Sequence, residues 1–150
     1  MIEPIAFDAA TPRFGMPFLV AGQAQKEFFV NESLALLDML VHPVVQGMAT
    51  IPPDAPVSGE CWIIADNAEG DWDGKSGSIA GWDGSQWTFI APQDGFHAYD
   101  RERASFVTYR NGWQAPVPIS APSGGSTVDS ECRVAIADLI AALKQRGLII

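Results

Sequence analysis

The sequence predicts an α+β protein made of an extended N-terminal arm, a short helix, a small antiparallel β-meander and a C-terminal helix. Apolar residues recur at helical spacing in two stretches, near residues 31–41 and 129–146. Between these stretches, turn dipeptides separate short runs rich in aromatic and β-branched residues, as in antiparallel hairpins. The 150 residues, 47% of them hydrophobic, are enough for one compact domain with a core.

The first 20 residues predict an extended arm. Pro4, Pro12 and Pro17 are too closely spaced for a long helix, while Phe7 and Phe14 belong to an apolar content too high for a disordered tail. We expect the arm to lie against another surface, and in a protein of this size that surface often belongs to a neighbouring subunit.

The first helix is predicted from about Asn31 to Val41. Asn31 is suited to cap the first turn, and Leu34, Leu37 and Val41 recur at helical spacing. The preceding run, residues 28–30, is aromatic and β-branched, which favours an extended segment or strand.

A β module is predicted over residues 51–115, after a short strand within residues 42–50 and a proline-rich connection. Its turn signals are Asp73-Gly74, Asp83-Gly84, Asp94-Gly95 and Asn111-Gly112. Its five predicted strands are residues 61–65, 78–82, 86–90, 96–99 and 105–109. Residues 1–50, with the arm, helix and short strand, form the region before this module.

Residues 116–127 are rich in proline, glycine and hydroxylic residues and predict a linker. The following region, residues 128–150, predicts a helix with acidic residues at its start, basic residues near its end and Gly147 after it. Its apolar stripe consists of Cys132, Ile136, Leu139 and Leu143. Two heptads are too short to form a stable coiled coil alone. We expect this oligomerisation helix to join several chains, as a trimer or a pentamer, with their β units also in contact.

The net charge of −9 and the pI of about 4.4 argue against nucleic acid as a partner, because phosphate recognition needs clustered Lys and Arg. Residues 51–100 contain nine acidic residues and one lysine. No window is long and apolar enough for membrane insertion, and the first residues lack the basic start of a signal peptide. We therefore expect synthesis and initial residence in a cytoplasm.

No catalytic, metal or cofactor site is predicted. His42 and His97 belong to no nucleophile motif, and Asp94, Asp100 and Glu102 offer no carboxylate pair that spacing alone defines. The acidic run over residues 66–74 lacks the ligand order of an EF-hand, so it is interpreted as a solvated loop. Cys61 and Cys132 lack metal or redox spacing, and we expect both thiols to be reduced and buried.

Four tryptophans beside the turns have two interpretations. Exposed rings of Trp72, Trp82, Trp87 and Trp113 would stack on sugars and bind a glycan. The alternative is that a small sheet needs large aromatic residues to bury enough apolar area.

Several ordered runs carry a family resemblance. They are Leu19-Val20-Ala21-Gly22-Gln23-Ala24-Gln25-Lys26-Glu27, Val30-Asn31-Glu32, Leu37-Asp38, Pro56-x-x-Gly59-Glu60-Cys61-Trp62-Ile63-Ile64, Ile79-Ala80-x-Trp82, Trp87-x-Phe89 and Pro92-x-x-Gly95-Phe96-x-Ala98. Over roughly residues 14–114, the sequence resembles a phage-derived family of small domains of unknown function from prophages and gene transfer agents of alphaproteobacteria.

The resemblance implies a structural virion component rather than an enzyme, similar to the head spike base of a gene transfer agent or a related fibre adaptor. Such a protein would contact the capsid vertex and a spike fibre and serve host attachment. The alternative is a carbohydrate-binding module for host-surface polysaccharide. An enzyme acting on glycan or peptidoglycan is a third hypothesis.

Overall fold

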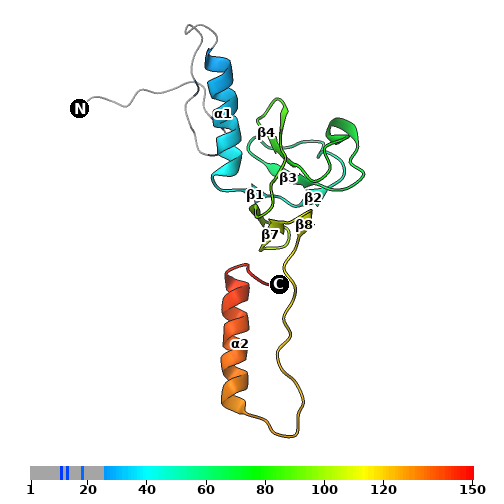
Figure 1. The fold of residues 1–150 in the computed structure, drawn as a ribbon. Coiled ribbons are helices and arrows are strands. Elements are labelled where there is room, and N and C mark those ends of the chain that lie inside the picture. Colours follow the sequence, from blue (N-terminus) through cyan, green and yellow to red (C-terminus); the bar gives the residue numbers. More distant parts are fainter. Residues whose placement is uncertain (1–10, 12, 14–17, 19–25) are drawn as a thin grey trace, which may run out of the picture. The chain divides into compact units, whose positions relative to one another are not determined.

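The computed structural model describes residues 11, 13, 18 and 26–150 and shows an α+β fold (Figure 1). The chain divides into two compact units, unit 1 over Met1–Pro92 and unit 2 over Gln93–Ile150. The predicted N-terminal arm lies outside the described residues, apart from Thr11, Arg13 and Phe18. The predicted division of the chain into residues 1–50, 51–115, 116–127 and 128–150 stays a prediction.

Helix α1 spans Lys26–Leu40 and begins five residues before the predicted start. Asn31 is therefore inside the helix, and the predictions of Asn31 as its cap and of residues 28–30 as extended are wrong. No glycine or proline interrupts residues 26–40, and Lys26 and Glu27 are good helix formers. The β preference of three aromatic or branched residues is too weak to stop a helix in this context.

Unit 1 contains a sheet with the order β2-β3-β4-β5, formed by Met48–Ala49, Cys61–Ile64, Ile79–Trp82 and Trp87–Ile90. β2 pairs with β3 in parallel, and the other pairs are antiparallel. The short strand predicted within residues 42–50 is present as β1, Val44–Val45, and β2. A 3-10 helix, η1, spans Gly70–Trp72 after β3.

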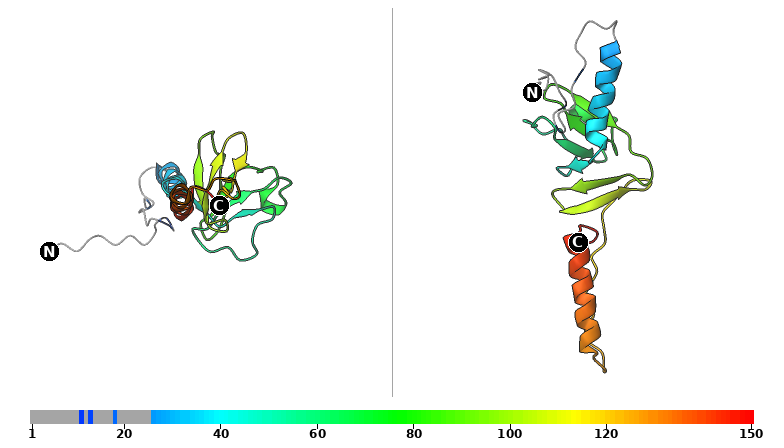
Figure 2. Two further views of the ribbon diagram at one scale, coloured as in Figure 1. Left: turned by 90° about the horizontal axis from the view of Figure 1, so that it is seen from below. Right: turned by 90° about the vertical axis from the view of Figure 1, so that its left-hand side faces the viewer.

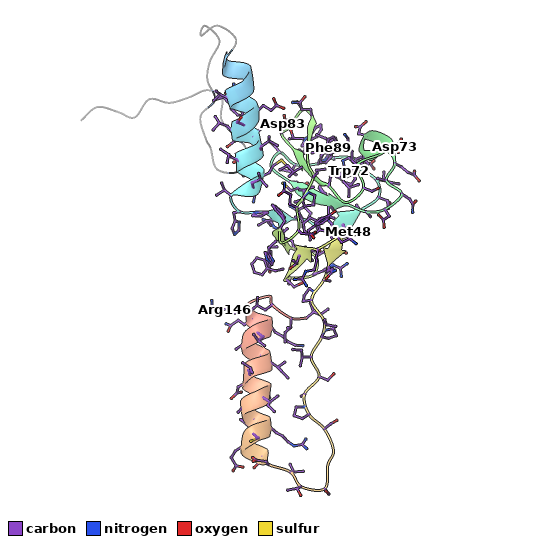
Figure 3. The ribbon with its side chains drawn as sticks, in the orientation of Figure 1. Met48, Trp72, Asp73, Asp83, Phe89 and Arg146 are labelled. Carbon is purple, nitrogen blue, oxygen red and sulfur yellow. The ribbon has the colours of Figure 1, made fainter. Side chains whose placement is uncertain are left out.

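The core of unit 1 includes Ile64, Ala68, Trp72 and Ala80, with Trp87 among the half-buried residues packed on it. Trp72 is completely buried, so η1 supplies the largest side chain of this core. Figure 3 shows Trp72 with side chains of the sheet around it.

Helix α1 lies beside this sheet in both views of Figure 2. A Cβ atom added to Gly81 of β4 would lie 2.7 Å from the sulfur atom and the terminal carbon of Met39. The absence of a side chain at Gly81 therefore lets the end of α1 pack directly on β4.

Unit 2 contains three antiparallel strands, β6 (His97–Asp100), β7 (Ser105–Tyr109) and β8 (Trp113–Gln114), followed by helix α2 (Ser130–Gln145). Tyr99 pairs with Phe106 across β6 and β7, and Tyr109 pairs with Trp113 across β7 and β8. Residues 115–129 contain no helix or strand. All five strands predicted in the β module are present, each within one residue of its expected bounds, and β8 is additional.

Two predicted turns connect neighbouring strands directly. Asp83-Gly84 begins the turn between β4 and β5, where the Asp83 carboxylate accepts hydrogen bonds from the backbone N–H groups of Ser85 and Gln86 at 2.7 and 2.8 Å. Asn111-Gly112 forms the turn between β7 and β8 with φ values of 50° and 127°, a conformation that Asn and Gly tolerate best. Asp73-Gly74 instead follows η1.

Candidate functional site

Helix α2 exposes its apolar stripe. The helix has no buried residue, and Ile136 and Leu139 of the predicted stripe are 42% and 60% exposed. Cys132 is also exposed, and Leu143 is half-buried. A helix with this composition normally buries its apolar side against another element, so α2 presents a surface suited to a partner.

Both ends of α2 are well defined. The Asp129 carboxylate caps the helix by accepting a hydrogen bond from the Cys132 N–H at 2.9 Å, and this bond holds the pKa of Asp129 below its usual 3.8. At the other end, the Leu148 N–H donates to the Leu143 carbonyl at 3.1 Å, and Gly147 has φ +66°, as in a glycine-terminated helix. The predicted start and stop of this helix are confirmed.

The C-terminal end of α2 is attached to the β6–β7 hairpin. The Gly147 carbonyl accepts a hydrogen bond from the Phe106 N–H at 2.8 Å, and Gly147 is buried. A Cβ atom at Gly147 would lie 3.3 Å from Ser105 Cα and 3.5 Å from the Tyr99 ring. Arg133, in the first turn, donates to the carbonyls of Pro122 and Gly124, so the linker lies beside α2.

The four candidate tryptophans have different surroundings. Trp72 is 0% exposed and packs edge-on against Trp87 at 5.1 Å between ring centroids, so the prediction of a glycan contact at Trp72 is wrong. Trp113 belongs to unit 2, where it packs on Phe96 and Tyr109. Two half-buried rings remain together in unit 1, Trp82 and Trp87, with centroids 5.0 Å apart.

A buried carboxylate on α1 was not singled out by the sequence. Asp38 is 2% exposed and accepts hydrogen bonds from the Thr11 hydroxyl at 2.8 Å and the Arg13 N–H at 2.9 Å. The Arg13 guanidinium also donates to the carbonyls of Asp38 and Met39 at the end of α1. These contacts fasten Thr11 and Arg13 to the C-terminal end of α1, where a cation is favoured by the helix dipole. No local sequence signal links residues 25 positions apart.

A scan against family models matches residues 30–114 with a family described as "Protein of unknown function (DUF2793)". The match covers more than half of the chain. The protein belongs to the DUF2793 family. Searches of curated proteins and of solved structures found no match.

In this DUF2793 protein the family match includes most of α1 and all eight strands, whereas α2 lies outside it. The candidate oligomerisation stripe therefore lies outside the matched residues. Trp82 and Trp87 lie within the matched residues.

Three of the residues considered for catalysis, His97, Asp94 and Asp100, have ordinary structural contacts. His97 Nδ1 lies 3.0 Å from the Thr108 hydroxyl, Asp100 pairs with Arg103 at 3.2 Å, and Asp94 accepts from the Asn111 N–H at 2.8 Å. Within the described part of the DUF2793 chain, no cluster of three or more His, Cys, Asp or Glu is arranged to hold a metal ion. None of its described helices has the length and apolarity needed to cross a membrane.

The two cysteines have different surroundings. Both are free thiols, but Cys132 is exposed, so the expectation that it is buried is wrong. The reason is that α2 buries no residue on its own chain. Cys61 is buried beside Asp38 and Met39 at a cavity of about 20 Å³, and burial raises its pKa from 9.0 to about 11.

Proposed function

We propose that this protein is a structural component of a phage-like particle, a gene transfer agent head spike base or a related fibre adaptor. It would be made in the bacterial cytoplasm and assembled into the particle, where it would join the capsid vertex to a host-binding fibre. The sequence resemblance described above supports both the assignment of this protein to a phage-like particle and its proposed position between capsid and fibre. Membership of the DUF2793 family identifies the domain and leaves its role open.

The observation that carries the proposal is the exposed apolar stripe of α2. Burying an apolar side chain is worth about 1.5–3 kcal/mol, so several such residues on each chain provide a substantial driving force for association. We propose that α2 helices of several copies form a bundle through Cys132, Ile136, Leu139 and Leu143. The length of the stripe is compatible with a trimer and with a pentamer, and five copies match the symmetry of a capsid vertex.

Leu139 and Val134 provide a matched test of this bundle. Both are 60% exposed in the single chain, yet they lie about 140° apart around the helix, and only Leu139 belongs to the stripe. We expect Leu139→Glu to lower the mass measured by light scattering, because it places a charge at the centre of the bundle. Val134→Glu should leave the mass unchanged. A monomeric wild-type protein, or equal effects of the two variants, would contradict the bundle.

Incorporation into particles is tested separately. We expect mass spectrometry of purified particles to detect the wild-type protein and the Val134→Glu variant, and to detect much less of Leu139→Glu. Absence of the wild-type protein from particles that are otherwise complete would refute the particle role even if the bundle exists.

The second candidate function is binding of host-surface polysaccharide. Trp82 and Trp87 lie together in unit 1, and Trp87 lines an open groove, which favours this candidate. The two functions are compatible, since a spike component can carry both an assembly helix and a ligand-binding domain.

A further inference from the structure

The sheet of unit 2 has one buried face and one open face. Along β6 and β7, buried residues alternate with residues whose side chains point to the opposite side of the sheet. The buried residues are Ala98, Asp100, Ser105 and Val107. The residues on the other side, which we call the open face, are His97, Tyr99, Phe106 and Thr108.

Two aromatic rings lie together on the open face. Tyr99 and Phe106 are directly paired across β6 and β7, and their rings pack edge to face with centroids 5.3 Å apart. Phe106 is 42% exposed, although the outer face of an antiparallel sheet usually carries polar side chains. Aromatic residues are enriched at the centres of protein interfaces, so the open face has the composition of a docking surface.

The C-terminal end of α2 lies beside this face. A Cβ atom on Gly147 would be 3.4 Å from the Ala104 carbonyl oxygen in the β6–β7 turn and 3.5 Å from the Tyr99 ring. The two segments that meet here carry four basic residues, which are Arg101, Arg103, Lys144 and Arg146. Arg146 is labelled in Figure 3.

Three of these basic residues are available to a partner. Arg103 forms an ion pair with the buried Asp100 at 3.2 Å. Within the described part of the chain, no ion pair or hydrogen bond involves the side chains of the other three, which are all exposed. We call these three residues, Arg101, Lys144 and Arg146, the basic rim. Glu102 is the one further acidic residue of this turn, so the rim keeps a net positive charge.

Unit 1 has a surface of the opposite charge. Residues 1–92 contain twelve acidic and three basic residues and residues 93–150 contain six of each, so the net charge of −9 comes from unit 1. Four exposed acidic residues in and around η1, which we call the acidic loop, are Asp66, Glu69, Asp71 and Asp73. The nearby Lys75 has its ammonium 5.4 Å from the Phe89 ring centroid. Asp73 is labelled in Figure 3.

The acidic loop borders an exposed apolar side chain. The Glu69 N–H donates a hydrogen bond to the Thr50 carbonyl at 2.9 Å, which places Ile51 next to the loop. A Cβ atom on Gly70 would lie 3.7 Å from the Pro52 side chain, so the two segments are in close contact. Ile51 is 56% exposed. This surface has an apolar centre with acidic residues beside it, whereas the open face has an aromatic centre with basic residues beside it.

We propose that the open face of one copy docks on the acidic loop and Ile51 of a second copy. Phe106 and Tyr99 would cover Ile51, while the basic rim would pair with the acidic loop. Two copies of unit 1 repel each other through their negative charge, which favours contact between unlike units. A contact between two different surfaces can close into a ring of copies. The proposal rests on the assembly of several copies proposed above and names the surfaces through which their β units touch.

The test uses the full-length protein with Leu139→Glu, so that the α2 bundle does not contribute. We expect sedimentation velocity at rising protein concentration to show a residual association of this variant. Raising sodium chloride from about 50 to about 500 mM should weaken that association by about tenfold or more, because salt screens exposed charges.

Two charge reversals in this background form a matched pair. One combines Arg101→Glu with Arg146→Glu, and the other combines Asp71→Lys with Asp73→Lys. Each protein by itself should associate about tenfold more weakly or worse, because like charges then face each other. An equimolar mixture should associate again, because the reversed rim of one protein meets the reversed loop of the other.

The aromatic centre is tested with Phe106→Ala in the same background. We expect this variant to weaken the association by about tenfold, as for a central aromatic residue of an interface. Ile119→Ala is the control, since Ile119 is 48% exposed but lies in the linker, away from the open face in sequence. It should leave the association unchanged.

Three results would overturn the inference. The first is a monomeric Leu139→Glu protein at low salt and at every concentration, and the second is a mixture of the two charge reversals that does not recover association. The third is an equal effect of Phe106→Ala and Ile119→Ala. A fall in mass from wild type to Leu139→Glu supports the bundle in each of these cases, so failure of the bundle and failure of this contact are separate outcomes.

Discussion

Cys61 and Cys132 show how strongly the surroundings of one residue determine its chemistry. Cys61 is 3% exposed at the start of β3, and burial, which is the largest influence on its thiol, raises its pKa to about 11. The Arg13 guanidinium acts in the opposite direction and only partly offsets burial. Cys132 lies on an exposed helix. The sequence indicated that the cysteines were isolated, but it did not distinguish these two environments.

The raised pKa of Cys61 predicts a loss of stability in alkaline solution. The unfolded chain releases the Cys61 proton near pH 9, whereas the folded chain retains it until about pH 11, so unfolding is favoured progressively between these values. We expect the unfolding free energy to fall by about 2–3 kcal/mol more in wild type than in Cys61→Ala over this interval. Urea titrations at pH 8, 9, 10 and 11 measure the difference. Parallel decreases in both proteins would show that the thiol is not responsible.

At the scale of elements, the strands were predictable and the first helix was only partly so. Strand-length apolar runs bounded by turn dipeptides predicted the bounds of β3 to β7 to within one residue. A two-residue hairpin signal also fixes the register of the strands that it connects. The start of α1 was missed because a capping residue such as Asn31 is also tolerated inside a helix. The fastening of α1 by Arg13 was unpredictable, since it joins residues that only the folded chain brings together.

Gly147 gives a prediction about the attachment of α2. Its φ of +66° and its short distance to Ser105 both oppose a side chain. We expect Gly147→Ala to weaken the contact with β7 and to cost about 1 kcal/mol or more, from the backbone conformation alone. Hydrogen exchange of the Phe106 amide, which donates to the Gly147 carbonyl, should accelerate. Gly124→Ala is the control, because its φ of +73° is similar but no atom outside its chain neighbours lies within 4 Å of the added Cβ. Equal acceleration in both variants would argue against a specific attachment.

At the scale of the whole molecule, the candidate sites differ in how far the sequence reveals them. The α2 stripe is a periodic pattern and was predicted residue by residue. The open groove that Trp87 lines has lining residues from α1 and from β5. These segments are more than 40 residues apart in the sequence, so no local pattern predicts the groove. The tryptophans were noticed, but burial of Trp72 and the position of Trp113 in unit 2 depend on packing that periodicity does not encode.

Cys132 makes the orientation of an α2 bundle measurable. In a parallel bundle in register, the Cys132 side chains of neighbouring chains meet, and diamide should link them as disulfides. An antiparallel arrangement would separate them by roughly 15–20 Å, from a rise of about 1.5 Å per residue. Since each thiol links to one other, a trimer leaves one of three chains unlinked and a pentamer leaves one of five.

Non-reducing gel electrophoresis measures the linked fraction. Cys61→Ala should behave as wild type, and Cys132→Ser should give no covalent dimer. An absence of linkage in an oligomer of confirmed mass would exclude the parallel arrangement in register.

The attachment of Gly147 to β7 also has a mechanical consequence. Within unit 2, the linker begins after β8 and the end of α2 is bonded to β7 through Phe106, so the segment between these two points is a loop held at both ends. Tension applied near Asp129 would be shared between two segments of the chain, the linker on one side and helix α2 on the other. A fibre attached there would have to break the Phe106–Gly147 contact before it could pull the helix free, and the stretched linker would remain as a tether.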